Sequence, residues 1–356
     1  MRFNPAPLIR LIGSRSFAMV LIVASVAVTV AHGLSGAGPL ITAGTGGFGL
    51  PWPGQWLTSP AWSLAATLGL ELLILTAIIQ LNRGFNLIRG LPAGSMLWGA
   101  LFMLFQSASP GAGSFTGGLI MALGALIATA LLYSVYQQPL LTRRILLVFV
   151  MLGAGSLFEY GCIPYFAVLV IGCIQMRVMN PRTIIAIVAG TLVPAWILVA
   201  FGLIELNRFI MPMPVSIFAH GSFETALPTV VTALVTIAAC LFTQMLDMLQ
   251  IYARNARTRA FFGLIATAGL MTSVLCVIDF GNIGFYTPLL NLTTAYFVTL
   301  LFSLRKRGAT GPGTTLIALL TLIFIGLCLW TFTASLMSSS RAASHLSTIA
   351  STALPR

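Results

Sequence analysis

Apolar runs separated by short polar loops extend along most of the chain. They predict eleven helical segments, in chain order at 17–30, 61–80, 91–105, 115–136, 145–158, 163–177, 183–206, 224–246, 260–278, 286–304 and 314–336. A helix needs about 20 apolar residues to cross a hydrocarbon core about 30 Å thick, and most of these runs approach that length. The pattern predicts an all-α bundle of transmembrane helices in one integral-membrane domain, residues 1–336, followed by a polar, poorly ordered tail at 337–356.

The segments 145–158 and 163–177 differ from the others because they are short and are joined by a polar break. Basic residues stand at both outer ends, at Arg144 and Arg177, so both ends are expected on the same side of the membrane. Arms of about 14 residues are roughly 21 Å long at 1.5 Å per residue. We therefore predict a hairpin, 145–177, that either re-enters the membrane without crossing it or crosses a locally thinned region. Irregular backbone at that depth has to be sheltered by the protein.

The composition is typical of a membrane protein and argues against a soluble domain and a nucleic-acid-binding protein. The chain is 58% hydrophobic and 7% charged, whereas soluble domains carry about 25% charged residues. Its 18 basic residues outnumber its 6 acidic ones, but they lie mostly in the short loops, and no basic face with interleaved aromatic residues suggests nucleic acid. With the N-terminus in the cytoplasm, the basic residues left outside are Arg208, Arg341 and Arg356. The sequence thus predicts a cytoplasmic N-terminus, a periplasmic C-terminus and membrane lipid as the surrounding partner.

Acidic side chains are few, and each is a candidate for function. Those expected at the outer ends of segments could bind a cation or act as a general base. The alternative is ordinary solvation of helix ends, which the helix dipole favours for Glu224. Glu159 is the strongest of the group because it lies at the sheltered hairpin tip, next to Tyr160. The outer acids are Glu159, Glu205, Glu224 and Asp279, and Asp247 is expected at the inner end of its segment.

Glu71 is different because it lies in the middle of segment 61–80, with apolar residues for a turn on either side. An ionisable group at that depth suggests function, here a proton-coupling or substrate-binding role. The alternative is a protonated, structural Glu71 that hydrogen-bonds to a carbonyl group or to Asn291. Both possibilities stay open.

The sequence lacks the residues that several kinds of metal and cofactor chemistry require. The three histidines are too few for an iron site built on four, and HExxH, CxxC, DxD and phosphate-loop motifs are absent, so no metal site and no cofactor are predicted. The five cysteines lie mostly in apolar runs and are expected to be buried thiols. Only Cys162, at the hairpin tip, is expected to be reactive.

Three stretches carry a resemblance to a known family. They are LNRGFNLIRGLPAGSMLWGALF at 81–102, LLYSVYQQ at 131–138 and SLFEYGCIPYFAVLVIGCIQMRVMNPRTIIAIVAGTLVPAW at 156–196. In this order they resemble an uncharacterised family of polytopic inner-membrane proteins of Gram-negative bacteria, over about residues 1–310. Genes of that family lie among envelope-glycan and polyprenol-sugar genes. The resemblance therefore implies a location in the inner membrane and a role in the cell envelope, but it assigns no catalytic residue. The family's hairpin tip commonly reads Tyr-Pro-Pro, and this chain departs from it at 159–164.

Three functions are compatible with these features. The first is a transporter or flippase of an amphipathic envelope precursor, such as a lipid-linked glycan. The hairpin and Glu71 support this function. The second is a non-catalytic accessory or scaffold subunit of an envelope assembly complex. The third is a membrane-embedded glycosyl-type transferase, against which the absence of acidic residues from the first outer loop, 33–60, counts. A non-enzymatic role is favoured, and the oligomeric state is left open.

Overall fold

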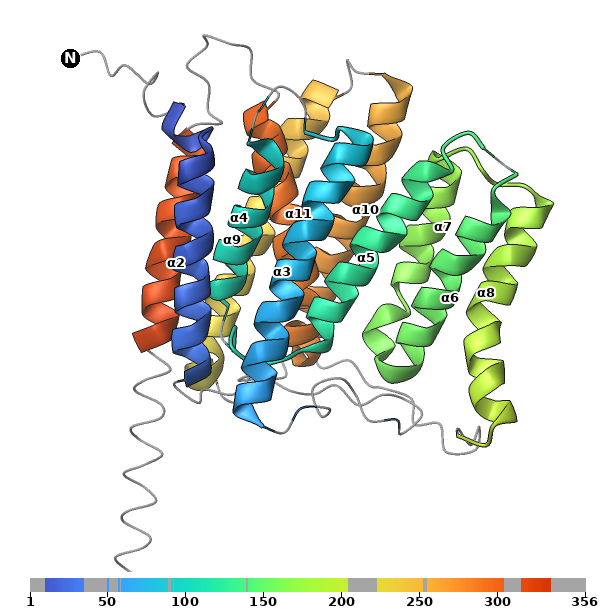
Figure 1. Cartoon of the computed structure of the whole chain (residues 1–356), viewed down its shortest axis with the longest axis horizontal. Helices are drawn as coiled ribbons and strands as arrows, with labels where there is room; N and C mark the ends of the chain where they lie inside the picture. The colour runs from blue at the N-terminus through green and yellow to red at the C-terminus, as the bar shows by residue number, and fades with distance from the viewer. Residues whose placement is uncertain are drawn as a thin grey trace, which may run out of the picture.

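Helices make up the regular structure of this chain in the computed structural model (Figure 1). The model describes residues 10–34, 50, 57, 59–88, 91, 93–109, 111–138, 140–203, 223–251, 255–303 and 315–333, and no strand occurs among them. The helices are α2 (Arg15–Leu34), α3 (Pro60–Phe85), α4 (Gly94–Ser107), α5 (Gly117–Ser134), α6 (Thr142–Phe158), α7 (Tyr165–Gln175), α8 (Pro181–Ala200), α9 (Phe223–Ile251), α10 (Ala256–Ile278), α11 (Ile283–Ser303) and a last helix at Thr315–Thr333. Each predicted segment corresponds to one of these helices, so the all-α bundle is confirmed.

Successive helices run up and down through the bundle (Figure 1). Within the described residues, eight of them are long and apolar enough to cross a membrane, which makes the chain a multi-pass membrane protein. The helix ends that carry Arg83, Arg144, Arg182 and Arg257 gather at one end of the bundle, the upper end in Figure 1, which we call the basic end. The predicted tail, 337–356, lies outside the described residues.

α11 is the central helix of the bundle. In the 18-residue apolar stretch of its span, Phe280–Ser303, 94% of residues are buried, against 17–44% in the corresponding stretches of the other seven candidate spans. A helix that is apolar on all sides and has no lipid-facing stripe belongs in the middle of a bundle. α4, α5, α9 and α10 pack around it. The site described below lies at the end of α11 that is opposite the basic end.

The predicted hairpin is α6 and α7, joined by the short 3₁₀ helix η2 (Tyr160–Cys162). Its tip reaches the far end of α10, because the Tyr160 hydroxyl donates a hydrogen bond to Asp279, the residue that ends α10. α6 has 17 residues, and at 1.5 Å per residue it is about 26 Å long. The hairpin tip therefore reaches the level at which α10 ends. Neither α6 nor α7 is among the eight described helices long enough to cross a membrane, so the choice between a crossing and a re-entrant hairpin stays a prediction. The turn between α10 and α11 shelters the tip.

α8 packs along α6 at the edge of the bundle (Figure 1). Glycines permit their close approach. A Cβ atom at Gly153 would lie 2.8 Å from the Thr191 carbonyl oxygen, and one at Gly190 would lie 2.8 Å from the Leu146 carbonyl oxygen. Both obstacles are backbone atoms, which cannot rotate away. Any larger side chain at these positions would separate the two helices.

Substitution Gly153→Leu is expected to loosen the α6–α8 contact. Overpacking of a tight contact typically costs about 1–3 kcal/mol of unfolding free energy, so thermal unfolding in detergent should begin at a lower temperature. Gly69→Leu is the control, because Gly69 is exposed on α3 and a Cβ atom there would meet nothing within 4 Å. Equal melting temperatures for both variants would contradict the assigned contact.

Candidate functional site

Polar side chains join the hairpin tip to the turn between α10 and α11. Glu159 ends α6, and Tyr160 begins η2. On the other side, Asp279 ends α10, the 3₁₀ helix η5 (Phe280–Asn282) follows, and Tyr286 lies in the first turn of α11. The cluster, which we call the tip cluster, consists of Glu159, Tyr160, Asp279, Asn282 and Tyr286.

The Asp279 carboxylate accepts hydrogen bonds from two phenols. Tyr160 Oη donates to its Oδ2 atom at 2.9 Å and lies 3.1 Å from Oδ1, and Tyr286 Oη donates to Oδ2 at 2.8 Å. Asp279 is 3% exposed and Tyr286 is 1% exposed. Two donors converge on one carboxyl group, so the two phenols fix the position of the Asp279 side chain.

Glu159 has a different environment. It is 4% exposed, and its Oε1 atom accepts a hydrogen bond from Asn282 Nδ2 at 3.0 Å. Burial raises the pKa of Glu159, the Asn282 hydrogen bond opposes this, and the charge of Asp279 adds to it. Glu159 therefore takes up a proton at a higher pH than an ordinary glutamate. Among the described residues, no basic side chain is a partner of either carboxyl group.

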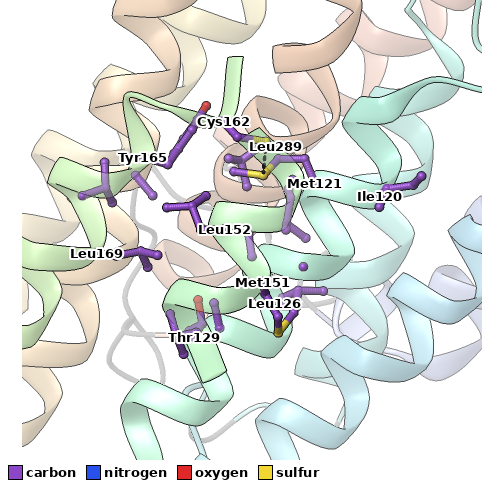
Figure 2. Close-up of a pocket in the computed structure, with 18 of the residues that line it drawn as sticks. Ile120, Met121, Leu126, Thr129, Met151, Leu152, Cys162, Tyr165, Leu169 and Leu289 are labelled. Atoms are coloured by element: carbon purple, nitrogen blue, oxygen red, sulfur yellow. Dashed lines mark hydrogen bonds between the residues drawn. The ribbon is translucent and has the colours of Figure 1, made fainter. Parts of the chain in front are cut away.

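An apolar cavity of about 420 Å³ extends from the tip cluster into the bundle (Figure 2). Helices α5, α6, α7, α10 and α11 supply its walls, with Leu152, Leu169 and Leu289 among them. Along α5 it reaches from Gly117 to Thr129, which is roughly 18 Å at 1.5 Å per residue. Glu159 lines the cavity near one end, so a long apolar space ends at a carboxyl group.

The cavity reaches the side of the bundle between α5 and α6. Ile120, which lines it, is 37% exposed, and small residues of both helices also line it. Gly124 on α5 is half-buried, and a Cβ atom there would meet nothing within 4 Å. On α6, the small lining residues are Ala154 and Gly155. A molecule in the surrounding lipid could therefore enter through this side.

The structure brings together three of the predicted candidates and separates the others. Glu159, Tyr160 and Asp279 meet in the tip cluster. Glu71 is fully buried in α3, and neither carboxyl oxygen has a hydrogen-bond partner among the described residues. The expected hydrogen bond from Glu71 to Asn291 is absent, because Asn291 Nδ2 donates to Gln106 Oε1 at 3.0 Å and to Ser109 Oγ at 3.3 Å. Glu205 and the Glu224 side chain lie outside the described part of the chain.

Asn282 and Tyr286 complete the tip cluster, and the sequence reasoning missed them. Their spacing held a usable signal: positions 279, 282 and 286 fall on one face of a helical turn. In the described ranges, no group of three or more His, Cys, Asp and Glu side chains is placed to hold a metal ion.

Cys162 was expected to be reactive at the hairpin tip, but the structure buries it. It is 4% exposed, and its Sγ atom lies 3.9 Å from Met121 Sδ in the cavity wall (Figure 2). The cysteines Cys173, Cys240, Cys276 and Cys328 are also buried.

A charged, membrane-impermeant thiol reagent is therefore expected to leave Cys162 unmodified in the folded protein. An uncharged, lipid-soluble maleimide should label Cys162 only slowly, because burial raises the pKa of this thiol and little of it is thiolate. Cys173, fully buried away from the cavity lining, should stay protected. Mass spectrometry of the digested protein gives the labelled positions. Labelling of Cys162 by the charged reagent would mean that the tip opens to water.

Comparisons with protein-family models, with curated proteins and with solved structures give no match for this chain. The site consists of a long apolar cavity lined near one end by the Glu159 carboxyl group, with the buried Asp279 carboxyl group in the neighbouring tip cluster.

Proposed function

We propose that the chain is a carrier, or flippase, for an amphipathic envelope precursor in the bacterial inner membrane. The observation that carries this proposal is the apolar cavity between α5 and α6 with the Glu159 carboxyl group near its end. Ligand pockets commonly have volumes of about 300–1,000 Å³ and apolar walls with a few polar groups, and this cavity has both properties. The resemblance to the envelope-associated family supports a lipid-linked glycan as the precursor.

The shape of the cavity suggests how such a ligand would sit. An extended hydrocarbon chain would enter from the lipid between α5 and α6 and lie along α5, in contact with aliphatic side chains. Burial of that chain supplies binding energy in proportion to its area, but the bilayer offers it a similar environment. Selectivity must then come from the polar end of the ligand, at the tip cluster.

The tip cluster favours a hydroxyl-bearing group over a phosphate. Carboxylates, amides and phenols accept or donate hydrogen bonds to sugar hydroxyls. A phosphate beside Glu159 and Asp279 would meet like charge with no basic side chain to offset it, which disfavours binding. The sugar of a lipid-linked glycan is therefore the part that would contact the cluster. In the predicted orientation this end faces the periplasm, where a delivered precursor would leave.

A transferase is the second candidate, because two carboxyl groups of unlike environment lie together. Burial raises the pKa of Glu159, whereas Asp279 accepts hydrogen bonds from two phenols. Such a pair can divide acid and base roles in glycosyl chemistry. The first outer loop, 33–60, lacks the acidic residues that polyprenol-sugar enzymes usually carry there. A scaffold has less support, since its interior would need no cavity of about 420 Å³.

Analysis of lipid extracts from a deletion strain distinguishes the three functions. A carrier's absence should cause an intact polyprenol-linked sugar to accumulate, and the accumulated lipid should also co-purify with the protein. Loss of a transferase would instead accumulate a precursor that lacks one group, and the purified protein would add that group. A normal lipid profile, with loss of partner proteins from a membrane complex, would contradict both and favour the scaffold.

A further inference from the structure

α9 presents polar residues to the bundle interior and apolar residues to the outside. On its outer side, Phe242, Met245 and Leu249 are 53%, 66% and 71% exposed. Its inner stripe, at spacings of three or four residues, is polar along its length, and each member is at most 9% exposed. The stripe is Thr229, Thr232, Thr236, Cys240, Thr243 and Asp247. Polar residues inside a membrane bundle are costly, and such residues mark ion and proton pathways.

The buried stripe of α3 provides a comparison, because it carries an acidic residue but is otherwise largely apolar. There, Glu71 is followed on the same face by Ile74, Ile78 and Leu81, so a single acid lies above an apolar surface. In α9 the acid continues a row of hydroxyl and thiol groups. The α9 stripe therefore offers a row of polar side chains one turn apart, which the α3 stripe does not.

The path begins at a small polar cavity of about 40 Å³, at the end opposite the basic end. Seven polar residues line it: Gln106, Ser109, Thr116, Thr229, Thr232, Thr236 and Thr287. The hydroxyl oxygens of Thr116 and Thr229 have no hydrogen-bond partner within the described structure, and neither does Asn291 Oδ1, whose amide nitrogen bonds to Gln106 and Ser109. One water needs roughly 10–15 Å³ and two or more polar partners, so the cavity is suited to hold water.

Further along, hydroxyl and thiol groups of three helices meet. Cys240 Sγ lies 4.0 Å from Thr293 Oγ1 of α11, and Ser273 of α10 also contacts it. Thr236 and Thr243 donate their hydroxyl protons to carbonyl oxygens one turn earlier, at 2.8 and 2.6 Å. Each hydroxyl oxygen keeps lone pairs that can accept a hydrogen bond. A row of such groups can pass a proton by accepting one and donating another.

The path ends at Asp247, close to the basic end of α9. Asp247 is fully buried, and in the part of the chain that the structure describes neither carboxyl oxygen has a hydrogen-bond partner. Among the described residues, the titratable group that faces it is Tyr296 of α11, and neither α10 nor α11 brings a charged side chain to it. An unpaired carboxylate in such a place is strongly disfavoured, whereas the protonated acid is not.

We propose that the polar stripe of α9 is a proton path and that Asp247 is the group that takes up and releases the proton. From Thr229 to Asp247 the helix rises about 27 Å, close to the thickness of the hydrocarbon core. The path would couple a proton gradient to events in the bundle. Its small polar cavity is distinct from the cavity between α5 and α6, although Thr293, which contacts Cys240, also lines that larger cavity. The proposed path does not depend on the proposed carrier function.

Infrared spectroscopy of hydrogen–deuterium exchange tests the path. Two proteins are compared, each keeping one cysteine, Cys240 or Cys173, with the other cysteines replaced by alanine. Both thiols are 0% exposed, but only Cys240 belongs to the stripe. After transfer into D₂O, the S–H band of Cys240 is expected to disappear at least about tenfold faster than that of Cys173, because exchange reports access to water and protons.

The same spectra examine Asp247. A carboxylic-acid band is expected that is missing from the Asp247→Asn variant and that exchanges as fast as the Cys240 thiol. Thr236→Val should slow exchange at Cys240, while Thr76→Val, at an exposed threonine of α3, should not. Equal exchange of Cys240 and Cys173 would overturn the path, and it can be measured even where the Asp247 variant fails to fold. No loss of an acid band in a folded Asp247→Asn protein would overturn the role of Asp247.

Discussion

Gly124→Leu is expected to abolish lipid binding while the protein stays folded. A Cβ atom at Gly124 meets open space, and the added side chain would extend into the cavity where α5 faces α6. Leucine also favours the helix over glycine by up to about 1 kcal/mol, so stability should not fall. Crosslinking to a photoactivatable lipid with a polyprenyl chain should drop at least about tenfold, which corresponds to about 1.4 kcal/mol.

Gly69→Leu is the matched control for this substitution. Gly69 is also a helical glycine with nothing within 4 Å of a Cβ atom, but it lies on the exposed side of α3, away from the cavity lining. Crosslinking and rescue of the deletion strain should remain at wild-type levels in this variant. If Gly124→Leu also crosslinked like the wild type, with an unchanged melting temperature, the cavity would not be the binding site.

Asp279→Ala is expected to destabilise the protein more than any other single change in the tip cluster. It removes the acceptor of two phenols, one of which, Tyr286, is 1% exposed and cannot turn to water. A buried donor left without a partner costs about 1–3 kcal/mol, and half-buried Tyr160 recovers part of its loss through solvent, so the total should be about 2–4 kcal/mol. Thermal unfolding in detergent measures the change.

A double-mutant cycle separates the hydrogen bond from the general effect of truncation. Asp279→Ala with Tyr160→Phe should cost less than the sum of the two single variants, because Tyr160 no longer has a hydroxyl group to satisfy. Asp279→Asn, which keeps one acceptor oxygen, should fall between the wild type and Asp279→Ala. Strictly additive effects would show that the bond from Tyr160 to Asp279 contributes nothing to stability.

The positions of the helices could be predicted from the sequence, and so could the gathering of the basic loops at one end of the bundle. Both depend on local sequence. The length of an apolar run decides whether a helix can cross, and the alternation of directions then assigns each loop to an end. This reasoning placed Glu159 and Asp279 at the same end although they lie far apart in sequence. It could not show that Tyr160 bonds to Asp279, because that requires knowing that the hairpin packs beside α10.

Contacts and cavities of the bundle interior depend on packing, which the sequence pattern does not report. Asn291 was a reasonable partner for Glu71 by depth, but α11 directs it toward Gln106 of α4. The same limit applies to glycines in one helix. A Cβ atom at Gly118 would lie 2.3 Å from the Phe285 carbonyl oxygen, whereas one at Gly124 would meet open space. Nothing in the local sequence distinguishes a glycine that permits contact from one that leaves a cavity.

The hydrogen bonds at the hairpin tip also set an order of events during synthesis. Tyr160 and Glu159 find their partners 119 and 123 residues later in the chain. When α6 and α7 leave the ribosome and enter the bilayer, Asp279 and Asn282 have not yet been made. The hairpin must therefore insert before the partners of its tip exist, and the tip can dock only after α10 and α11 arrive. A chain truncated before α10 is expected to hold the hairpin loosely, as a substrate for quality-control proteases.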